Sequence, residues 1–298
     1  MHALSVDVED FTSAALLLAC GRIAAPTYEV VRNTEALLGL CAEHETRATW
    51  FVLGEVADVY PQLVRRIAGE GHELGVHGWH HHKIHQLDQQ DYRLSMARAK
   101  SLLEDLSGNP VRGYRAVAMS ISHSTWWAYE VLAELGFAYS SSVFPFRGSR
   151  YGLPGAPVGP YVVSTPHHGP VLEIPFSVVT IGPMRLPALG GGYLRHFPLI
   201  YTRYSLSALE RRGRRAVVYL HPYELQDCGG LEGLTESLSP EEYDSLHRAV
   251  RGHFRNRHHT EAKIRWLLGR GRFGPLEEAF SLELQELEER AHERRLQP

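Results

Sequence analysis

The sequence is poor in cysteine and lacks a long apolar segment. Its 298 residues include only Cys20, Cys41 and Cys228, an odd number at wide spacings that argues against a disulfide scaffold or a cysteine-built zinc site. The best membrane-like stretch, residues 14–20, is far shorter than the roughly 20 residues that span a bilayer. The N-terminus has no basic and apolar signal-peptide pattern. We therefore expect a cytoplasmic protein with no transmembrane segment. Peripheral association with the inner membrane is compatible with this expectation.

The sequence also has no excess of one charge. Its 31 Lys and Arg residues stand against 34 Asp and Glu residues, for a formal net charge of -3, so the basic footprint of a nucleic-acid-binding protein is missing. The hydrophobic share of 44% is ordinary for a globular protein. What is abundant is histidine, with 18 residues that are clustered along the chain.

Short apolar segments alternate with helical patterns along most of the chain. The predicted strands are residues 4–8, 48–53, 111–116, 137–142, 171–174 and 216–220, with a further strand end and loop in 71–85. The predicted helices are residues 28–43, 61–69, 88–107, 125–135, 198–212 and 276–296. This alternation is typical of parallel βαβ units. Residues 144–196, rich in proline and glycine, predict a loop-rich insertion within a single domain spanning 1–298.

Polar clusters follow three of these strands. Asp7, Glu9 and Asp10 follow the first strand, a His-rich run at 77–85 follows a later one, and His221 follows the last. Each alone has an ordinary explanation as a helix cap or a surface histidine. Because functional sites of α/β sheets and barrels assemble at the carboxyl ends of strands, the three clusters together predict one site.

The His-rich run offers two pairs of metal ligands. Both His77/His81 and His81/His85 have the i,i+4 spacing that places two imidazoles on one face of a helical turn, and the spacing does not choose between them. A carboxylate from Glu9, or from Asp10 if the strand bulges, would complete a two-His, one-carboxylate site with open positions. Such a site activates water, so hydrolysis is the natural chemistry.

Two further residues could serve that hydrolysis. Asp7 and Glu9 are two apart on an extended chain and can point to one side, one toward the metal and one toward the water. His221 could protonate a leaving group from the opposite side, because a pKa near neutrality suits a general acid.

Several segments resemble, in order, the NodB-like polysaccharide deacetylases, which form carbohydrate esterase family 4. These are SVDVEDF (5–11), ATWFVLG (48–54), GHELGVHGWHHH (71–82), VRGYRA (111–116) and VVYLHPYE (217–224). Three more, FPFRGSRYGLPGAP (144–157), GGGYLR (190–195) and RFGPL (272–276), are similar to the branch associated with exopolysaccharide clusters. The resemblance covers roughly residues 3–280. It implies an α/β fold, a distorted and incomplete (β/α) barrel of about seven strands.

The same resemblance implies an activity and a metal site. The implied enzyme removes acetyl groups from N-acetylhexosamine units of a glycan, releasing acetate, with one divalent metal for which zinc is expected. Asp7 would be the general base and Glu9 the metal carboxylate, with Asp10 as the alternative. His77 and His81 would be the imidazole ligands, which selects one register of the His-rich run.

Further roles follow from the other matching motifs. Arg115 matches the arginine that holds the catalytic aspartate ionised and oriented, and His221 matches the general acid that protonates the departing amine. Tyr151 and Tyr193 lie in the loop-rich region and could stack on a sugar ring.

The chain departs from the family pattern at two positions. Val117 stands where the family has a proline after Arg-Ala, and Ser140 stands where the related branch has an aspartate that could tune His221. Both departures bear on catalytic rate more than on metal binding. Two alternatives therefore remain open: hydrolysis of a small linear or cyclic amide on the same scaffold, and a carbohydrate-binding protein that has lost turnover.

Overall fold

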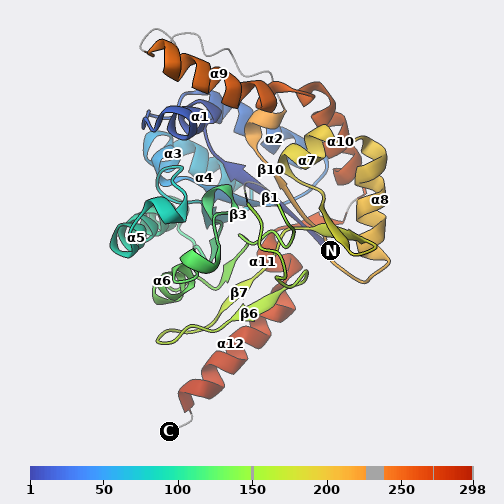
Figure 1. Ribbon diagram of the computed structural model, residues 1–298. Helices are drawn as coiled ribbons and strands as arrows, with labels where there is room; N and C mark the ends of the chain where they lie inside the picture. The colour runs from blue at the N-terminus through green and yellow to red at the C-terminus, as the bar shows by residue number, and fades with distance from the viewer. Residues whose placement is uncertain (149–150, 226–237, 271, 297–298) are drawn as a thin grey trace.

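A computed structural model describes residues 1–148, 151–225, 238–270 and 272–296, and one curled sheet surrounded by helices forms its body (Figure 1). The strands are β1 (His2–Val8), β2 (Thr49–Val52), β3 (Glu73–Val76), β4 (Gly113–Tyr114), β5 (Tyr139–Ser140), β6 (Tyr161–Val163), β7 (Val171–Glu173), β8 (Val178–Ile181), β9 (Met184–Pro187), β10 (Val217–Leu220) and β11 (Phe273–Gly274). The helices are α1 (Phe11–Cys20), α2 (Glu29–Glu43), α3 (Gly54–Val59), α4 (Pro61–Gly69), α5 (Gln89–Ser107), α6 (Ala128–Glu134), α7 (Gly191–His196), α8 (Leu199–Glu210), α9 (Pro240–Phe254), α10 (Thr260–Leu268), α11 (Leu276–Ala279) and α12 (Ser281–Leu296).

The strand order of the main sheet is β10-β1-β2-β3-β4-β5-β7-β6, and β11 also pairs with β1. Every pair from β10 to β7 is parallel, whereas β6 joins the edge in the antiparallel sense. The outer strands β10 and β6 do not pair with each other in the described part of the chain. The sheet is therefore an incomplete barrel, which confirms the predicted fold class.

Strand β1 shows how one segment serves two layers. All seven of its residues are buried, as expected for a parallel strand covered on both faces. Because side chains alternate along a strand, Leu4, Val6 and Val8 join the apolar layer under the helices. Ser5 and Asp7 point to the other face, where both contact Arg115.

Large aromatic side chains fill the interior of the half-barrel. Phe51, Tyr139, Phe176 and Tyr219 belong to one buried cluster. Glycines on neighbouring strands make room for them: a Cβ at Gly75 would lie 2.4 Å from the ring of Phe51. The resulting layer of aromatic side chains lies inside the half-barrel, below the polar residues at the strand ends.

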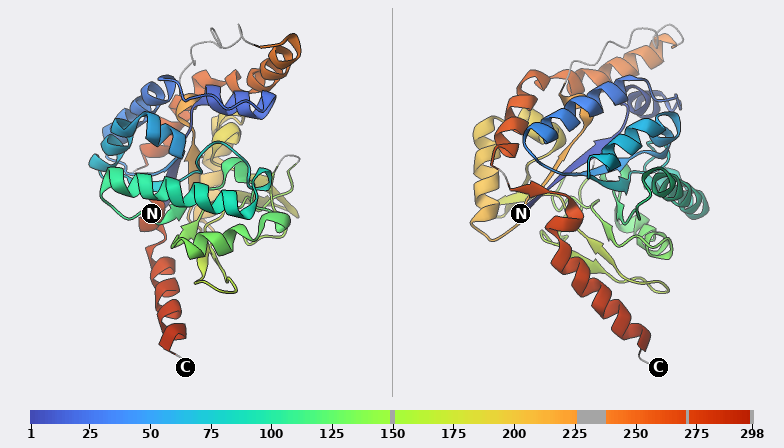
Figure 2. Two further views of the ribbon diagram at one scale, coloured as in Figure 1. Left: turned by 90° about the vertical axis from the view of Figure 1, so that its left-hand side faces the viewer. Right: turned by 180° about the vertical axis from the view of Figure 1, so that it is seen from behind.

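The predicted helix at 276–296 is two helices, because the chain leaves helical geometry at Phe280 (φ -120°, ψ 27°). The buried ring of Phe280 belongs to the interior aromatic cluster, and α12 then extends away from the body (Figures 1 and 2). Its first turns stay attached through buried Leu284 and Leu287.

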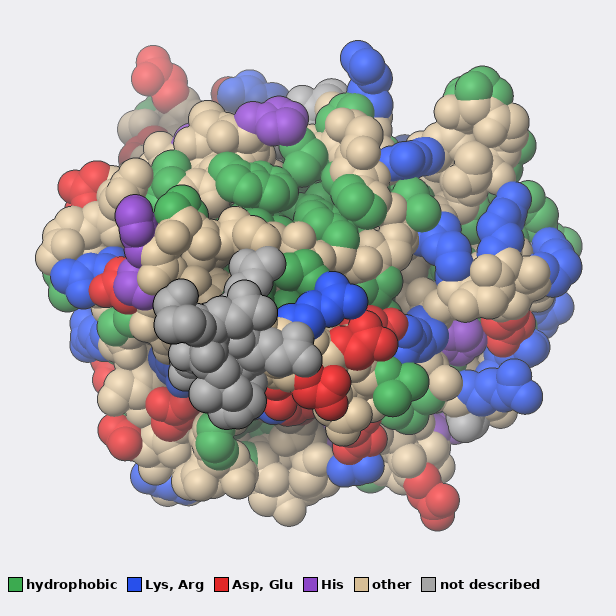
Figure 3. Space-filling model, turned by 90° about the horizontal axis from the view of Figure 1, so that it is seen from below, with side chains coloured by type: hydrophobic (Ala, Val, Ile, Leu, Met, Phe, Trp, Pro, Cys, Tyr) green, Lys and Arg blue, Asp and Glu red, His purple; other side chains and the backbone are tan. Residues whose placement is uncertain are grey.

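Ion pairs also join α11 and α12 to the rest of the chain, and acidic and basic side chains are interspersed on the face seen from below (Figure 3). Arg112 pairs with Glu277, with 2.6 Å between Nη1 and Oε1, and Arg215 pairs with Glu283. Pairs exposed to this degree contribute roughly 0–1 kcal/mol each, so the buried leucines stabilise the contact more.

No helix in the described ranges is both long and apolar enough to cross a membrane.

A partly buried carboxylate, that of Glu73, lies at the start of β3. Glu73 Oε2 accepts hydrogen bonds from Thr49 Oγ1 at 2.5 Å and from the Glu277 backbone N–H at 3.2 Å, and Oε1 accepts one from Tyr139. Burial raises the pKa of Glu73 to about 7, since it outweighs the three hydrogen bonds, which act in the opposite direction.

We predict that Glu73 makes stability fall with rising pH between about 4.5 and 7. The pKa of this carboxyl is higher in the folded than in the unfolded chain, so folding favours the protonated form and loses free energy as the proton leaves. Glu73→Gln should remove about 1–2 kcal/mol of this pH dependence, measured by urea unfolding at pH 5 and pH 8. Glu286→Gln, at an exposed position, serves as the control. An unchanged pH dependence of stability in Glu73→Gln would contradict the raised pKa assigned to Glu73.

Candidate functional site

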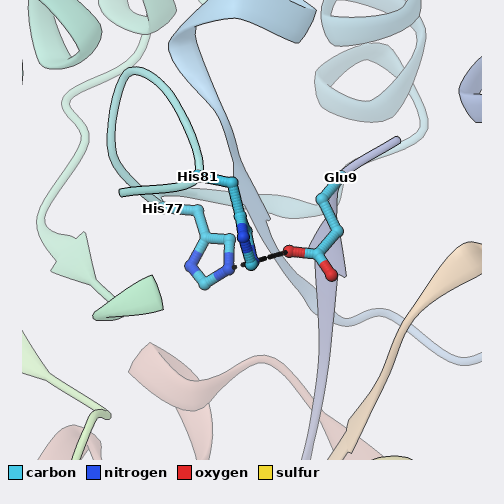
Figure 4. A group of neighbouring side chains, drawn as sticks. All are labelled: Glu9, His77 and His81. Atoms are coloured by element: carbon cyan, nitrogen blue, oxygen red, sulfur yellow. Dashed lines mark ion pairs between the residues drawn. The ribbon is translucent and has the colours of Figure 1, made fainter. Parts of the chain in front are cut away.

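Three ligand-type side chains meet at the carboxyl ends of β1 and β3. His77 and His81 point toward Glu9 (Figure 4). Glu9 Oε2 lies 2.8 Å from His81 Nε2 and 3.5 Å from His77 Nε2. All three residues are buried, and their ligand atoms lie within 4.8 Å of one another.

This cluster fits a divalent cation by the chemistry of its donors. His77 Nδ1 lies 2.9 Å from the Arg115 carbonyl oxygen, so Nδ1 is the protonated nitrogen and Nε2 keeps its lone pair toward Glu9. Apart from the two rings, Glu9 Oε2 has no hydrogen-bond partner among the described residues. Two imidazole nitrogens and one carboxylate oxygen are the ligand set of catalytic zinc and related metals.

The charge of the cluster suits the same role. Burial alone would raise the pKa of Glu9, but the neighbouring imidazoles of His81 and His77 outweigh it and hold this pKa well below its usual range. The second carboxylate oxygen of Glu9 accepts a hydrogen bond from Tyr223 Oη at 3.0 Å. Glu9 is therefore an oriented anion.

The loop after β3 sets the register of the histidines. Gly78 has φ +112°, a conformation that favours glycine, and its carbonyl accepts from the Gly54 N–H at 2.8 Å. The loop turns His77 and His81 toward Glu9, whereas His85 is exposed and outside the cluster. Of the two i,i+4 pairs in the sequence, the structure brings His77/His81 together.

Asp10 has different partners from Glu9. It is the N-cap of α1, with Oδ1 accepting from the Thr12 N–H at 3.3 Å, and Oδ2 accepting from the Thr27 N–H at 2.7 Å. Burial raises the pKa of Asp10 despite these hydrogen bonds. Of the two carboxylates considered as metal ligands, Glu9 is the one that lies between the histidines.

Asp7 and Arg115 form a buried ion pair next to this cluster. Arg115 Nη1 donates to Asp7 Oδ1 at 2.8 Å and to Ser5 Oγ at 2.8 Å. Its Nε and Nη2 donate to the backbone oxygen and hydroxyl of Ser141. The pair fixes one oxygen of Asp7 and leaves Oδ2 facing His221, whose Nε2 lies 3.8 Å away.

His221 directly follows β10 and faces the carboxylates of Asp7 and Glu9. Its Nε2 is 3.8 Å from both Asp7 Oδ2 and Glu9 Oε1. Burial alone would lower the pKa of His221, but the carboxylates of Glu224, Glu9 and Asp7 outweigh burial and raise it to about 9. The imidazole is therefore protonated at neutral pH.

The sequence interpretation missed Glu224 and Tyr223, although both stand in the quoted segment VVYLHPYE. Tyr223 stacks on His221 with ring centroids 5.0 Å apart. Ser140 stands where the related branch has an aspartate that could tune His221. Its Oγ lies 2.8 Å from Ser142 Oγ. The carboxylate beside His221 comes from Glu224, three residues further on.

The two tyrosines predicted to contact a sugar contact each other. The Tyr151 hydroxyl donates to that of Tyr193 at 3.2 Å, and both rings pack on Phe144. Val117 precedes Ala118 and Met119, whose φ angles are +49° and +53°. Such backbone costs of order 1 kcal/mol per residue and often marks functional loops.

Two family models match this chain. A model described as polysaccharide deacetylase matches residues 24–139, and one described as a domain of unknown function, DUF3473, matches residues 141–281. The first range contains His77, His81 and Arg115, and the second contains His221. Asp7 and Glu9 precede both ranges.

Curated relatives match over part of their length. A peptidoglycan-N-acetylglucosamine deacetylase of Bacillus cereus is 35% identical over 75 residues, 25% of this chain and 27% of the relative. The peptidoglycan deacetylase-like protein FGM2 of Gibberella zeae is 31% identical over 107 residues (36% and 31%), and the peptidoglycan deacetylase of Helicobacter pylori is 28% identical over 112 residues (36% and 36%). The matches thus span about a third or less of these relatives.

Solved structures share the fold over nearly the whole chain. A protein assigned as a polysaccharide deacetylase from Mycobacterium smegmatis aligns with TM-score 0.55 and 20% identity, covering 92% of this chain and 91% of that one. A similarly assigned protein from Pseudomonas aeruginosa PAO1 gives 0.54 and 16%, covering 91% of each chain. The allantoinase PuuE gives 0.51 and 15%, covering 89% of each. At these identities the likeness concerns the fold alone.

We predict that metal retention depends on the three clustered residues. His77→Ala, His81→Ala and Glu9→Gln should each lose at least tenfold in affinity for zinc, since each removes one of three protein ligands. His85→Ala, in the same His-rich run but exposed, is the matched control and should bind as the unchanged protein does. Elemental analysis after dialysis and competition titration with a chromophoric chelator would measure this. Metal loss in His85→Ala with retention in His77→Ala would reject the register.

Proposed function

Residues 24–139 of this chain belong to the polysaccharide deacetylase family, and from this premise we propose that the protein is a metal-dependent N-deacetylase. Its substrate is an N-acetylated glycan or glycan precursor, from which it releases acetate and leaves a free amine. The observation that carries the proposal is the meeting of Glu9, His77 and His81 at one strand-end edge, with Asp7 and His221 directly beside them.

The clustered residues would hold the Lewis acid of the reaction. A divalent cation held by Glu9, His77 and His81 would polarise the acetyl carbonyl and the attacking water. We propose zinc, because two imidazoles and one carboxylate with open positions are typical of hydrolytic zinc sites.

Asp7 receives the proton of the attacking water. Its Oδ1 is fixed by Arg115 at 2.8 Å, so Oδ2 is the oxygen available on the side of the metal cluster. General-base transfer of this kind contributes roughly 10²–10⁴-fold in rate. Arg115 acts by orienting Asp7 and by compensating its buried charge.

His221 delivers the proton that the leaving group needs. An amide nitrogen departs as an amine only if it is protonated while the C–N bond breaks. His221 Nε2 faces the site, and its raised pKa of about 9 keeps it in the acid form at neutral pH. Base and acid thus come from the ends of neighbouring strands, β1 and β10.

The proposed substrate is a polymer of N-acetylhexosamine. The name of one curated relative refers to the N-acetylglucosamine of peptidoglycan and that of another to peptidoglycan, and the resemblance of segments 144–157 and 190–195 favours an exopolysaccharide for this chain. Tyr151 and Tyr193 would offer a ring face to a sugar. Because the allantoinase shares the fold, the fold alone does not select sugar over a small amide, and the choice of sugar depends on the family match.

We predict metal-dependent acetate release from N-acetylglucosamine oligosaccharides. Asp7→Asn should keep the metal and lose about 10²–10⁴-fold in kcat, because the amide cannot accept the proton. Asp58→Asn, at an exposed position on α3, is the matched control and should keep full activity. Enzymatic acetate determination with zinc-loaded and chelated samples gives the rates.

Three outcomes of this assay would contradict the proposal. Turnover of a small amide without release from sugar would assign the alternative hydrolase. Oligosaccharide binding with no acetate despite bound metal would assign a carbohydrate-binding protein. Normal turnover by Asp7→Asn would remove Asp7 as the base.

We also predict that kcat falls on the alkaline side. His221 must be protonated to act, so activity is present below its pKa and is lost as pH rises through it. The limb should lie at or below pH 9, since a cation on Glu9 disfavours the imidazolium. A pH–rate profile from pH 6 to 10 measures it, with His221→Gln as the variant whose residual activity lacks the limb. A kcat that rises steadily to pH 10 would exclude His221 as the acid.

A further inference from the structure

The turn that follows β10 folds a carboxylate back onto His221. Residues Pro222–Glu224 form a 3₁₀ turn, in which the Glu224 N–H donates to the His221 carbonyl at 3.0 Å. Glu224 Oε2 accepts from the His221 backbone N–H at 3.1 Å and lies 3.6 Å from His221 Nδ1. The carboxylate is almost completely buried, with 1% of Glu224 exposed.

The other oxygen of Glu224 is fixed by an arginine. Arg195, buried on α7, donates from Nη1 to Glu224 Oε1 at 3.0 Å. The end of α7 is itself anchored, because Lys263 Nζ donates to the carbonyls of Leu194, Arg195 and Phe197 at 2.7–2.9 Å. Glu224 therefore stands between a fixed guanidinium and the imidazole.

The imidazole of His221 is left with two different environments. Its Nε2 faces Asp7 and Glu9, whereas Nδ1 is buried and has no hydrogen-bond partner at normal distance among the described residues. The Glu224 oxygen at 3.6 Å needs to approach by only a few tenths of an ångström to accept from Nδ1. Hydrogen bonds of catalytic groups often tighten in this way when substrate binds.

We propose that Glu224, held by Arg195, is the positioning carboxylate of His221, an assignment that rests on the proposed deacetylase function. Glu224 accepts the Nδ1–H and so fixes the ring orientation and the tautomer, as a carboxylate does for a catalytic histidine in other hydrolases. The proton on Nε2 then moves to the amide nitrogen as the C–N bond breaks. His221 ends neutral, with Nδ1–H still directed at Glu224.

This arrangement also gives a reason for the serine at position 140. The buried hydroxyl of Ser140 faces Ser142 within the sheet, and the carboxylate reaches His221 from the turn after its own strand. The chain thus supplies a partner for the acid at a different position from the one where the related branch has an aspartate.

The test compares two leaving groups in Glu224→Gln. An N-acetylglucosamine oligosaccharide needs a proton on its leaving nitrogen, whereas p-nitrophenyl acetate releases a stable phenolate without one. We expect kcat for the amide to fall about 10²-fold or more, kcat for the aryl ester to fall less than about threefold, and the bound metal to stay unchanged. Arg195→Lys, which keeps the charge, should retain more amide activity than Arg195→Met. Glu277→Gln, which removes the carboxylate of another Arg–Glu pair, is the matched control.

Equal losses on both substrates would make Glu224 merely structural, and no loss would remove it from the mechanism; either result overturns the proposal. A second measurement needs no variant: ¹⁵N NMR of the His221 imidazole in the zinc-loaded protein should show Nδ1 protonated and hydrogen-bonded. An unprotonated Nδ1 overturns the proposal even if Glu224→Gln does not fold. Failure of the deacetylase function is separate, because the unchanged protein would then release no acetate.

Discussion

Arg115 connects Asp7 with His77. Its guanidinium donates to Asp7 on β1 and to the backbone oxygen of Ser141 after β5. The backbone carbonyl oxygen of Arg115 lies 2.9 Å from His77 Nδ1. A buried charge is costly unless it is paired and hydrogen-bonded, and Arg115 meets this condition with four hydrogen bonds. Its plane also lies over the ring of Phe51, 4.2 Å from the centroid. The orientation of both the proposed base and one proposed metal ligand thus depends on this residue.

The parallel sheet explains why residues distant in sequence meet here. Asp7 lies next to the last residue of β1, His77 follows β3, and His221 follows β10, so all three strands bring polar residues to one edge of the sheet. These polar residues lie next to a buried aromatic layer that includes Phe51 and Tyr219. Interactions between the charged groups are therefore stronger than they would be in water.

The sequence predicted the elements whose local signals are strong. Strand β1 lies within two residues of its predicted start because Leu4, Val6 and Val8 alternate along it, and helix α4 begins at Pro61 as predicted. Helix α1 was not predicted, although Asp10 caps its start and Gly21, with φ +66°, ends it. The same Asp10 was considered as a metal ligand, since a cap and a ligand look alike in a sequence.

The parts of the site that were not predicted depend on tertiary contacts. The i,i+4 spacing could not separate His77 from His85, because the choice depends on how the loop at Gly78 turns toward Glu9. The role of Glu224 depends on Arg195, which lies 29 residues earlier and meets it only in the folded chain. Helix 276–296 divides because the ring of Phe280 packs in the core, a contact that helical periodicity does not encode.

The most direct test of the account is anomalous diffraction at the zinc edge from crystals of the zinc-loaded protein. We expect one strong peak about 2.0–2.2 Å from Glu9 Oε2, His77 Nε2 and His81 Nε2. A peak at other residues, or none at this edge of the sheet, would contradict it.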